Sequence, residues 1–139
     1  MKRAEVVTAV IVREGRILLT QRKRSSPLAF RWGGPGGEVK PGETHTAALA
    51  RELGEEIGVS IVGHLDKPLW TTLLDPPDVD KALYVVTYLV YASAASPEAT
   101  PREGQGLGWF LACEVAALPL TPADEAHRRE ILELLRRAA

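Results

Sequence analysis

The sequence predicts an α/β fold in which a mixed β-sheet lies between helices. Residues 6–12 and 83–92 are rich in the β-branched and aromatic side chains that favour strands. Between them, residues 45–57 show the apolar period of a helix, and a second helical pattern begins at Thr121. With 139 residues, 45% of them hydrophobic, the chain can form one globular domain, which we expect to span residues 1–139.

The first strands are expected to form a hairpin at the centre of the sheet. Residues 6–12 are apolar at nearly every position, which is typical of a strand covered on both faces. Glu14-Gly15 predicts a turn, and residues 16–20 continue as the second strand. A basic cluster that begins at Arg22 follows, and it fits either a polyphosphate contact or a solvated turn.

The helix expected at residues 45–57 places three carboxylates on one face. Glu52, Glu55 and Glu56 stand at positions i, i+3 and i+4, so their side chains converge and repel one another. Hard divalent cations take oxygen ligands, so this acidic stripe is a candidate Mg²⁺ or Mn²⁺ platform; the alternative is a solvated acidic surface. The apolar side chains expected to pack inward from the adjoining face are Leu49, Ala50, Leu53 and Ile57.

A glycine-rich loop leads into that helix and favours the metal-site interpretation. Backbone N–H groups and left-handed conformations in such a loop can hold anionic oxygen. Phosphate and metal would then meet at one place. The glycines and prolines of the loop are Gly33, Gly34, Pro35, Gly36, Gly37, Pro41 and Gly42.

Extended segments and turns are expected to follow the acidic helix. Residues 60–74 form an extended stretch broken at Gly63 and Pro68, and residues 83–92 are the longest strand. The last helix is expected to begin with Thr121 at its N-cap and Pro122 at its first position. It would continue through the helically spaced residues His127, Ile131, Leu134, Leu135 and Ala138.

Gly37, Glu43 and the run from Arg51 to Val59 match every fixed position of the Nudix box, and the chain resembles the Nudix hydrolase family. The resemblance implies the α/β/α Nudix sandwich with a mixed β-sheet. It also implies hydrolysis of a nucleoside diphosphate linked to another moiety, with Mg²⁺ or Mn²⁺ as cofactor. Gly34 departs from the family pattern, which usually has a bulky apolar residue just before Pro-Gly-Gly. Either the pocket is roomier here or a neighbour such as Trp32 fills the gap.

The resemblance also implies roles for individual residues. The carboxylates Glu52, Glu55 and Glu56 would bind metal, and Glu52 is the preferred general base, although family members place that base variously. Arg51 and Glu43 would orient the carboxylates. The further metal ligands implied are the Gly36 carbonyl and Glu103, which lies in a Glu-Gly-Gln…Trp segment typical of MutT-type members.

Candidate substrate contacts are Arg22, Trp32, Gly36, Gly37 and Asp124. Trp32 fits either stacking on a base or covering the core. In MutT-type members an Asn at the place of Asp124 reads a purine edge. Because an ionised Asp only accepts hydrogen bonds, Asp124 would prefer a base with a free amino group, such as cytosine or adenine, over an oxidised guanine. The alternative is that Asp124 only caps its helix.

The substrate expected from these MutT-like segments is a (deoxy)nucleoside triphosphate, cut to monophosphate and pyrophosphate. An ADP-sugar or dinucleotide pyrophosphatase is the alternative within the family; Pro76 and Pro77 lie near, but not on, the proline position of those subfamilies. An inactive Nudix-fold nucleotide-binding module is the alternative from another class. The intact acidic stripe argues against it.

Charge and composition restrict the partners. A net charge of -1 and a pI near 6.3 argue against binding of long nucleic acid, which requires clustered basic residues. Cys113 is the only cysteine, so no internal disulfide can form, and a cytoplasmic setting is the simpler expectation. No apolar stretch is long enough to span a membrane. The sequence leaves open whether the chain forms a homodimer.

Overall fold

The structure, a computed structural model, describes residues 2–22, 29–64, 66–75, 81–92 and 106–138, and its strands form two sheets. The first sheet consists of β1 (Lys2–Val10), β5 (Gly36–Glu38), β6 (Ile61–His64), β7 (Trp70–Leu74) and β8 (Lys81–Ala92). It is mixed, because β1 runs parallel to β8 and antiparallel to β5. The second sheet is antiparallel and consists of β2 (Val12–Arg13), β3 (Arg16–Gln21), β4 (Trp32–Gly33) and β9 (Gly106–Phe110).

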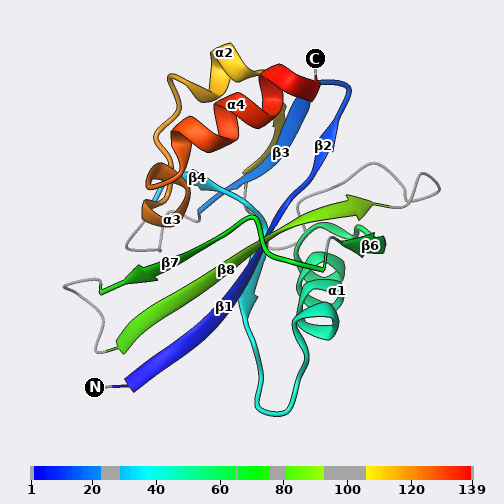
Figure 1. Cartoon of the computed structure of the whole chain (residues 1–139), viewed down its shortest axis with the longest axis vertical. Helices are drawn as coiled ribbons and strands as arrows, with labels where there is room; N and C mark the ends of the chain where they lie inside the picture. Colours follow the sequence, from blue (N-terminus) through cyan, green and yellow to red (C-terminus); the bar gives the residue numbers. More distant parts are fainter. Residues whose placement is uncertain (1, 23–28, 65, 76–80, 93–105, 139) are drawn as a thin grey trace.

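The helices are α1 (His45–Ile57), α2 (Ala112–Val115), α3 (Pro122–Glu125) and α4 (Arg128–Ala138). Figure 1 shows α1 beside the mixed sheet, with α2, α3 and α4 gathered near β3 and β4. Each group of helices covers its own hydrophobic cluster, one around Leu49 and Val86 and the other around Ile17 and Ile131. The predicted α/β class with a mixed sheet is confirmed. None of the described helices is long and apolar enough to cross a membrane.

Local signals determine both ends of α1. The Thr44 side chain accepts a hydrogen bond from the Ala47 backbone N–H, and Gly58 ends the helix in the left-handed conformation with φ 67°. The predicted range of the helix is therefore confirmed. Ala50, which was expected to pack inward, is exposed, whereas Ala48 is fully buried. Ala48 shares a helix face with Glu52 and Glu56, and both of these side chains contact β5.

The predicted N-terminal strand is divided between the two sheets. β1 begins before residue 6 and ends at Val10, and the chain then changes sheets, so that only Val12 and Arg13 pair with β3. The hairpin turn is confirmed: Glu14 and Gly15 both have positive φ, as a two-residue turn of this twist requires. The prediction of a single hairpin from residues 6–12 and 16–20 was therefore wrong in extent.

The C-terminal helix is interrupted. Thr121 and Pro122 do begin α3, but α3 ends at Glu125 and α4 begins at Arg128. At the break, the His127 backbone N–H donates to the Asp124 carbonyl, and the His127 ring stacks on Trp70 of β7 with a centroid distance of 4.8 Å. This contact with a distant strand accompanies a break that the sequence pattern did not predict.

Candidate active site

The acidic helix α1 lies against β5, and two of its carboxylates contact that strand. Glu56 is only 6% exposed, and its Oε2 accepts a hydrogen bond of 2.9 Å from the Gly36 backbone N–H. Glu52 lies over Gly37, where a Cβ atom would be 2.4 Å from the Glu52 carboxyl carbon. The absence of a side chain at position 37 therefore makes room for the Glu52 carboxylate.

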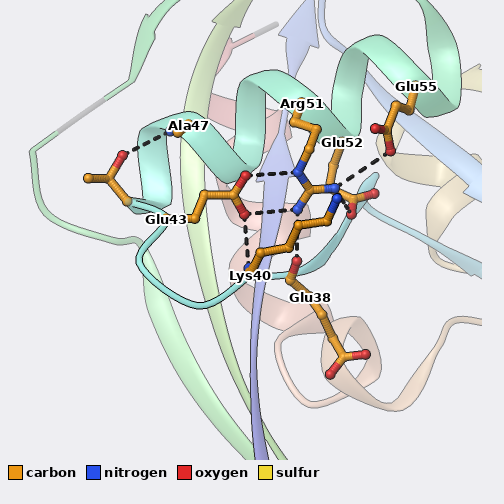
Figure 2. A network of polar contacts seen from close by, with 8 residues as sticks. Glu38, Lys40, Glu43, Ala47, Arg51, Glu52 and Glu55 are labelled. Atoms are coloured by element: carbon orange, nitrogen blue, oxygen red, sulfur yellow. Dashed lines mark hydrogen bonds and ion pairs between the residues drawn. The ribbon is translucent and has the colours of Figure 1, made fainter.

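Arg51 is the centre of the polar network shown in Figure 2. Its Nε and Nη2 donate to the two carboxylate oxygens of Glu43 over 2.8 and 2.9 Å. Its Nη1 donates to Glu52 Oε1 over 2.7 Å and lies 3.5 Å from Glu55 Oε2. Its Nη2 also donates to the Glu38 carbonyl. One guanidinium thus joins the loop before the helix to the acidic stripe.

The pairing of Arg51 with Glu43 shifts the pKa of both groups. Hydrogen bonds from Arg51, and then from the Lys40 backbone N–H, lower the pKa of Glu43 to about 2. Hydrogen bonds to Glu43 and Glu52 raise the pKa of Arg51 above its ordinary value. Both partners are therefore charged at neutral pH.

The low pKa of Glu43 predicts how its stabilising contribution depends on pH. The folded-state pKa lies below the ordinary value of 4.5, so the contribution is fully present above pH 4.5 and is lost as the pH falls toward 2. We expect Glu43→Gln to unfold more easily in urea than the wild type at pH 7. The difference in unfolding free energy should shrink steadily between pH 4.5 and 2, and a difference that stayed constant over this range would contradict the assignment.

The donor set of the acidic stripe fits a hard divalent cation, because Glu52, Glu55 and Glu56 offer only oxygen. Among the described residues, no three acidic, histidine or cysteine side chains lie close enough together to hold an ion by themselves. Glu52 and Glu55 instead share the Arg51 guanidinium. The Glu55 side chain is 56% exposed, so it can turn toward a cation without disturbing the core. Mg²⁺ commonly completes its shell with water and substrate phosphates.

Two of the predicted substrate contacts outside the loop, Arg22 and Trp32, lie on the second sheet and its edge. Trp32 is half-buried and packs edge-on against Phe110, with ring centroids 4.9 Å apart, as the core-covering alternative requires. Arg22 follows β3, and its charge is near enough to Asp124 to favour the ionised form of that carboxyl. Glu103 lies outside the described residues.

Asp124 is 5% exposed and contacts the glycine loop. Its Oδ2 accepts hydrogen bonds from the Gly34 backbone N–H over 2.8 Å and from the Thr121 hydroxyl over 3.3 Å. Burial raises the pKa of Asp124, and these two hydrogen bonds oppose the rise. The sequence pattern did not predict this contact, although the paired glycines 33 and 34 were a signal of close approach.

The unusual Gly34 has a simple steric explanation. A Cβ atom at this position would lie 2.6 Å from the Ala9 carbonyl oxygen. The backbone of β1 therefore leaves no room for a side chain at position 34.

Comparison with known proteins identifies the family. A family model described as the NUDIX domain matches residues 1–135. The chain belongs to the Nudix family. Together with the names of its relatives, this makes the protein a Nudix pyrophosphohydrolase.

The relatives of this Nudix hydrolase include MutT-like proteins. A Mycobacterium tuberculosis protein, provisionally named 8-oxo-dGTP diphosphatase 2, is 34% identical over 96% of this chain and 92% of its own length. The CTP pyrophosphohydrolase of Escherichia coli is 51% identical, but only over 42% of this chain and 44% of its own. The crystal structure of a MutT NUDIX hydrolase from Burkholderia pseudomallei superposes with a TM-score of 0.78 and 32% identity, covering 96% and 98% of the two chains.

Proposed function

We propose that this Nudix hydrolase cuts a (deoxy)nucleoside triphosphate to the monophosphate and pyrophosphate, with Mg²⁺ or Mn²⁺ as cofactor. The observation that supports this most is the acidic stripe held against the Gly36–Gly37 backbone, with Arg51 joining it to the preceding loop. Two relatives carry the names of nucleoside triphosphate hydrolases, which also favours a triphosphate over other substrates.

In the proposed reaction, water attacks a phosphorus atom, the bond to the leaving phosphate oxygen breaks, and the attacking water loses a proton to a carboxylate. A bound divalent cation would neutralise phosphate oxygens and lower the pKa of the attacking water. Glu52 is our preferred proton acceptor and would also bind the cation, together with Glu55 and Glu56. Since Arg51 donates to Glu52 Oε1, we assign the proton to Oε2. Glu43 keeps the guanidinium in place.

A screen of nucleotides with Mg²⁺, in which all products are resolved, tests the proposal. Monophosphate and pyrophosphate from a nucleoside triphosphate, with full loss of turnover on addition of a chelator, would support it. AMP and a sugar phosphate, or two mononucleotides, would instead favour the ADP-sugar or dinucleotide pyrophosphatase alternative. Turnover that ignores the chelator would contradict the metal assignment, and no turnover of any nucleotide would favour a binding module.

The base preference is a separate prediction that depends on Asp124. Oδ2 of Asp124 already accepts two hydrogen bonds, so any contact with a base would use Oδ1. If an ionised Asp124 reads the base, dCTP or ATP should be cleaved faster than 8-oxo-dGTP. Since burial raises the pKa of Asp124, this preference should weaken as the pH is lowered. The measurement is kcat/KM for each nucleotide; faster cleavage of 8-oxo-dGTP would rule the preference out.

A further inference from the structure

Residues 33–37 form the crossing between the two sheets. Gly33 pairs with Thr20 in the second sheet, and Gly36 pairs with Thr8 in the mixed sheet. Between them, the Pro35 carbonyl accepts a hydrogen bond of 2.9 Å from the Ala9 backbone N–H. The position of this crossing segment therefore determines where the Gly36 N–H meets the acidic helix.

Two buried carboxylates hold the crossing segment by alternate backbone N–H groups. Asp124 Oδ2 accepts from Gly34 over 2.8 Å, and Glu56 Oε2 accepts from Gly36 over 2.9 Å. Asp124 and Glu56 are 5% and 6% exposed. They are the only buried acids among the described residues, and they come from two different helices, α3 and α1.

The crossing segment has little room to move. A Cβ atom at Gly33 would lie 2.6 Å from Thr121 Oγ1 and 2.9 Å from Asp124 Oδ2, and one at Gly36 would lie 2.0 Å from the Val7 carbonyl oxygen. Such contacts are well inside normal packing distances. A change on the Asp124 side would therefore be transmitted along the backbone to Gly36.

The residues before Asp124 are joined to the same stretch of chain. The Trp32 N–H donates to the Pro119 carbonyl, and the Thr121 N–H donates to the Trp32 carbonyl, each over 2.8 Å. The Arg31 guanidinium donates to the Leu120 carbonyl over 3.0 Å. Residues 119–124 are therefore hydrogen-bonded at several points to residues 31–34, and Asp124 makes the last of these bonds along the chain.

We infer that Asp124 is a positioning residue, which acts through the Gly34 N–H to hold Gly36, and with it Glu56, in the geometry that the reaction needs. This inference rests on the proposed function where activity is measured. It concerns Oδ2 and the backbone, and it predicts a loss of kcat for every base, which adds to any preference in kcat/KM that Oδ1 provides.

Three variants test the inference by activity. Asp124→Leu removes the acceptor, and we expect kcat to fall roughly 10- to 100-fold for every nucleotide cleaved. Asp124→Asn keeps an oxygen for the Gly34 N–H and should recover most of that loss. Glu125→Ala, a control on the same helix that removes only a surface pair with Arg128, should leave kcat unchanged. A kcat that is unchanged for any one base, or an Asp124→Asn variant as slow as Asp124→Leu, would overturn the inference.

Hydrogen exchange of individual amides, followed by NMR, tests the inference without any substrate. In Asp124→Leu the Gly36 amide should exchange at least tenfold faster than in the wild type, while the amides of Leu49 and Leu53 in α1 stay protected. Thr121→Val removes only the second hydrogen bond to Oδ2, so the Gly36 amide should show a smaller increase in exchange rate. This variant replaces Asp124→Leu in the test if Asp124→Leu does not fold. Unchanged exchange at Gly36 would overturn the inference. If the wild type cleaves no triphosphate, the proposed function fails, and this measurement still decides the positioning role.

Discussion

Glu56→Gln is expected to lower kcat by at least roughly 10²-fold while the fold stays intact. A bound cation supplies several kcal/mol of transition-state stabilisation, which the loss of one charged ligand would weaken, and each ~1.4 kcal/mol corresponds to a factor of ten in rate. The amide oxygen of glutamine can still accept the hydrogen bond from the Gly36 N–H, so the buried contact survives. The charge is lost, but the shape is kept.

The measurement is kcat at saturating Mg²⁺ and nucleotide, together with the thermal unfolding midpoint. We expect the midpoint to change little because the substitution is nearly isosteric. Glu133→Gln provides a matched control, since this glutamate is exposed on α4 and pairs only with Arg137 in the described part of the chain. Near-normal turnover by Glu56→Gln would remove Glu56 from the site.

The second large effect is expected from Gly37→Ala. Its Cβ would lie 2.4 Å from the Glu52 carboxyl carbon and 2.5 and 2.6 Å from the two carboxylate oxygens, so the Glu52 side chain must move away. A displacement of about 1 Å in a reacting group can cost roughly 10²-fold in rate. We therefore expect kcat to fall by about that factor. Stability should change little, since the group that moves is the end of a flexible side chain.

Gly54→Ala is the matched control for the added methyl group. It lies in the same helix as Glu52, and among the described residues no heavy atom beyond the nearby backbone of that helix would lie within 4 Å of a Cβ there. It should leave kcat unchanged and stabilise the protein by about 0.5–1 kcal/mol. A double-mutant cycle then tests the cause: Gly37→Ala should add almost no further loss to Glu52→Ala. If the two losses multiply, Gly37 does not act through Glu52.

Sequence patterns predicted α1 within its observed bounds because the signals for that helix are local. Thr44 and Gly58 provide its caps, and the apolar residues repeat at helical spacing. The acidic stripe, its link to Arg51 and the closeness of the glycine loop followed from the same short stretch. Helix geometry determines the relative positions of side chains three or four residues apart, so these contacts can be predicted without the rest of the fold.

Other features depend on contacts between distant parts of the chain. The N-terminal strand changes sheets after Val10, and the C-terminal helix breaks where His127 stacks on Trp70. The prediction that Ala50 packs inward was wrong because the buried face of α1 depends on where β5 lies. The residue types at these positions fit the predicted pattern as well as the observed structure, so they give no local signal of the difference.

By itself, the sequence determined the chemistry available to this protein: an acidic helical stripe, an arginine beside it and a glycine loop before it, in the order and spacing of the Nudix box. The tertiary structure decided which backbone groups those side chains meet. Asp124 reaches Gly34 across 90 positions of the chain, and no local propensity specifies such a contact, because it depends on how the two sheets pack together.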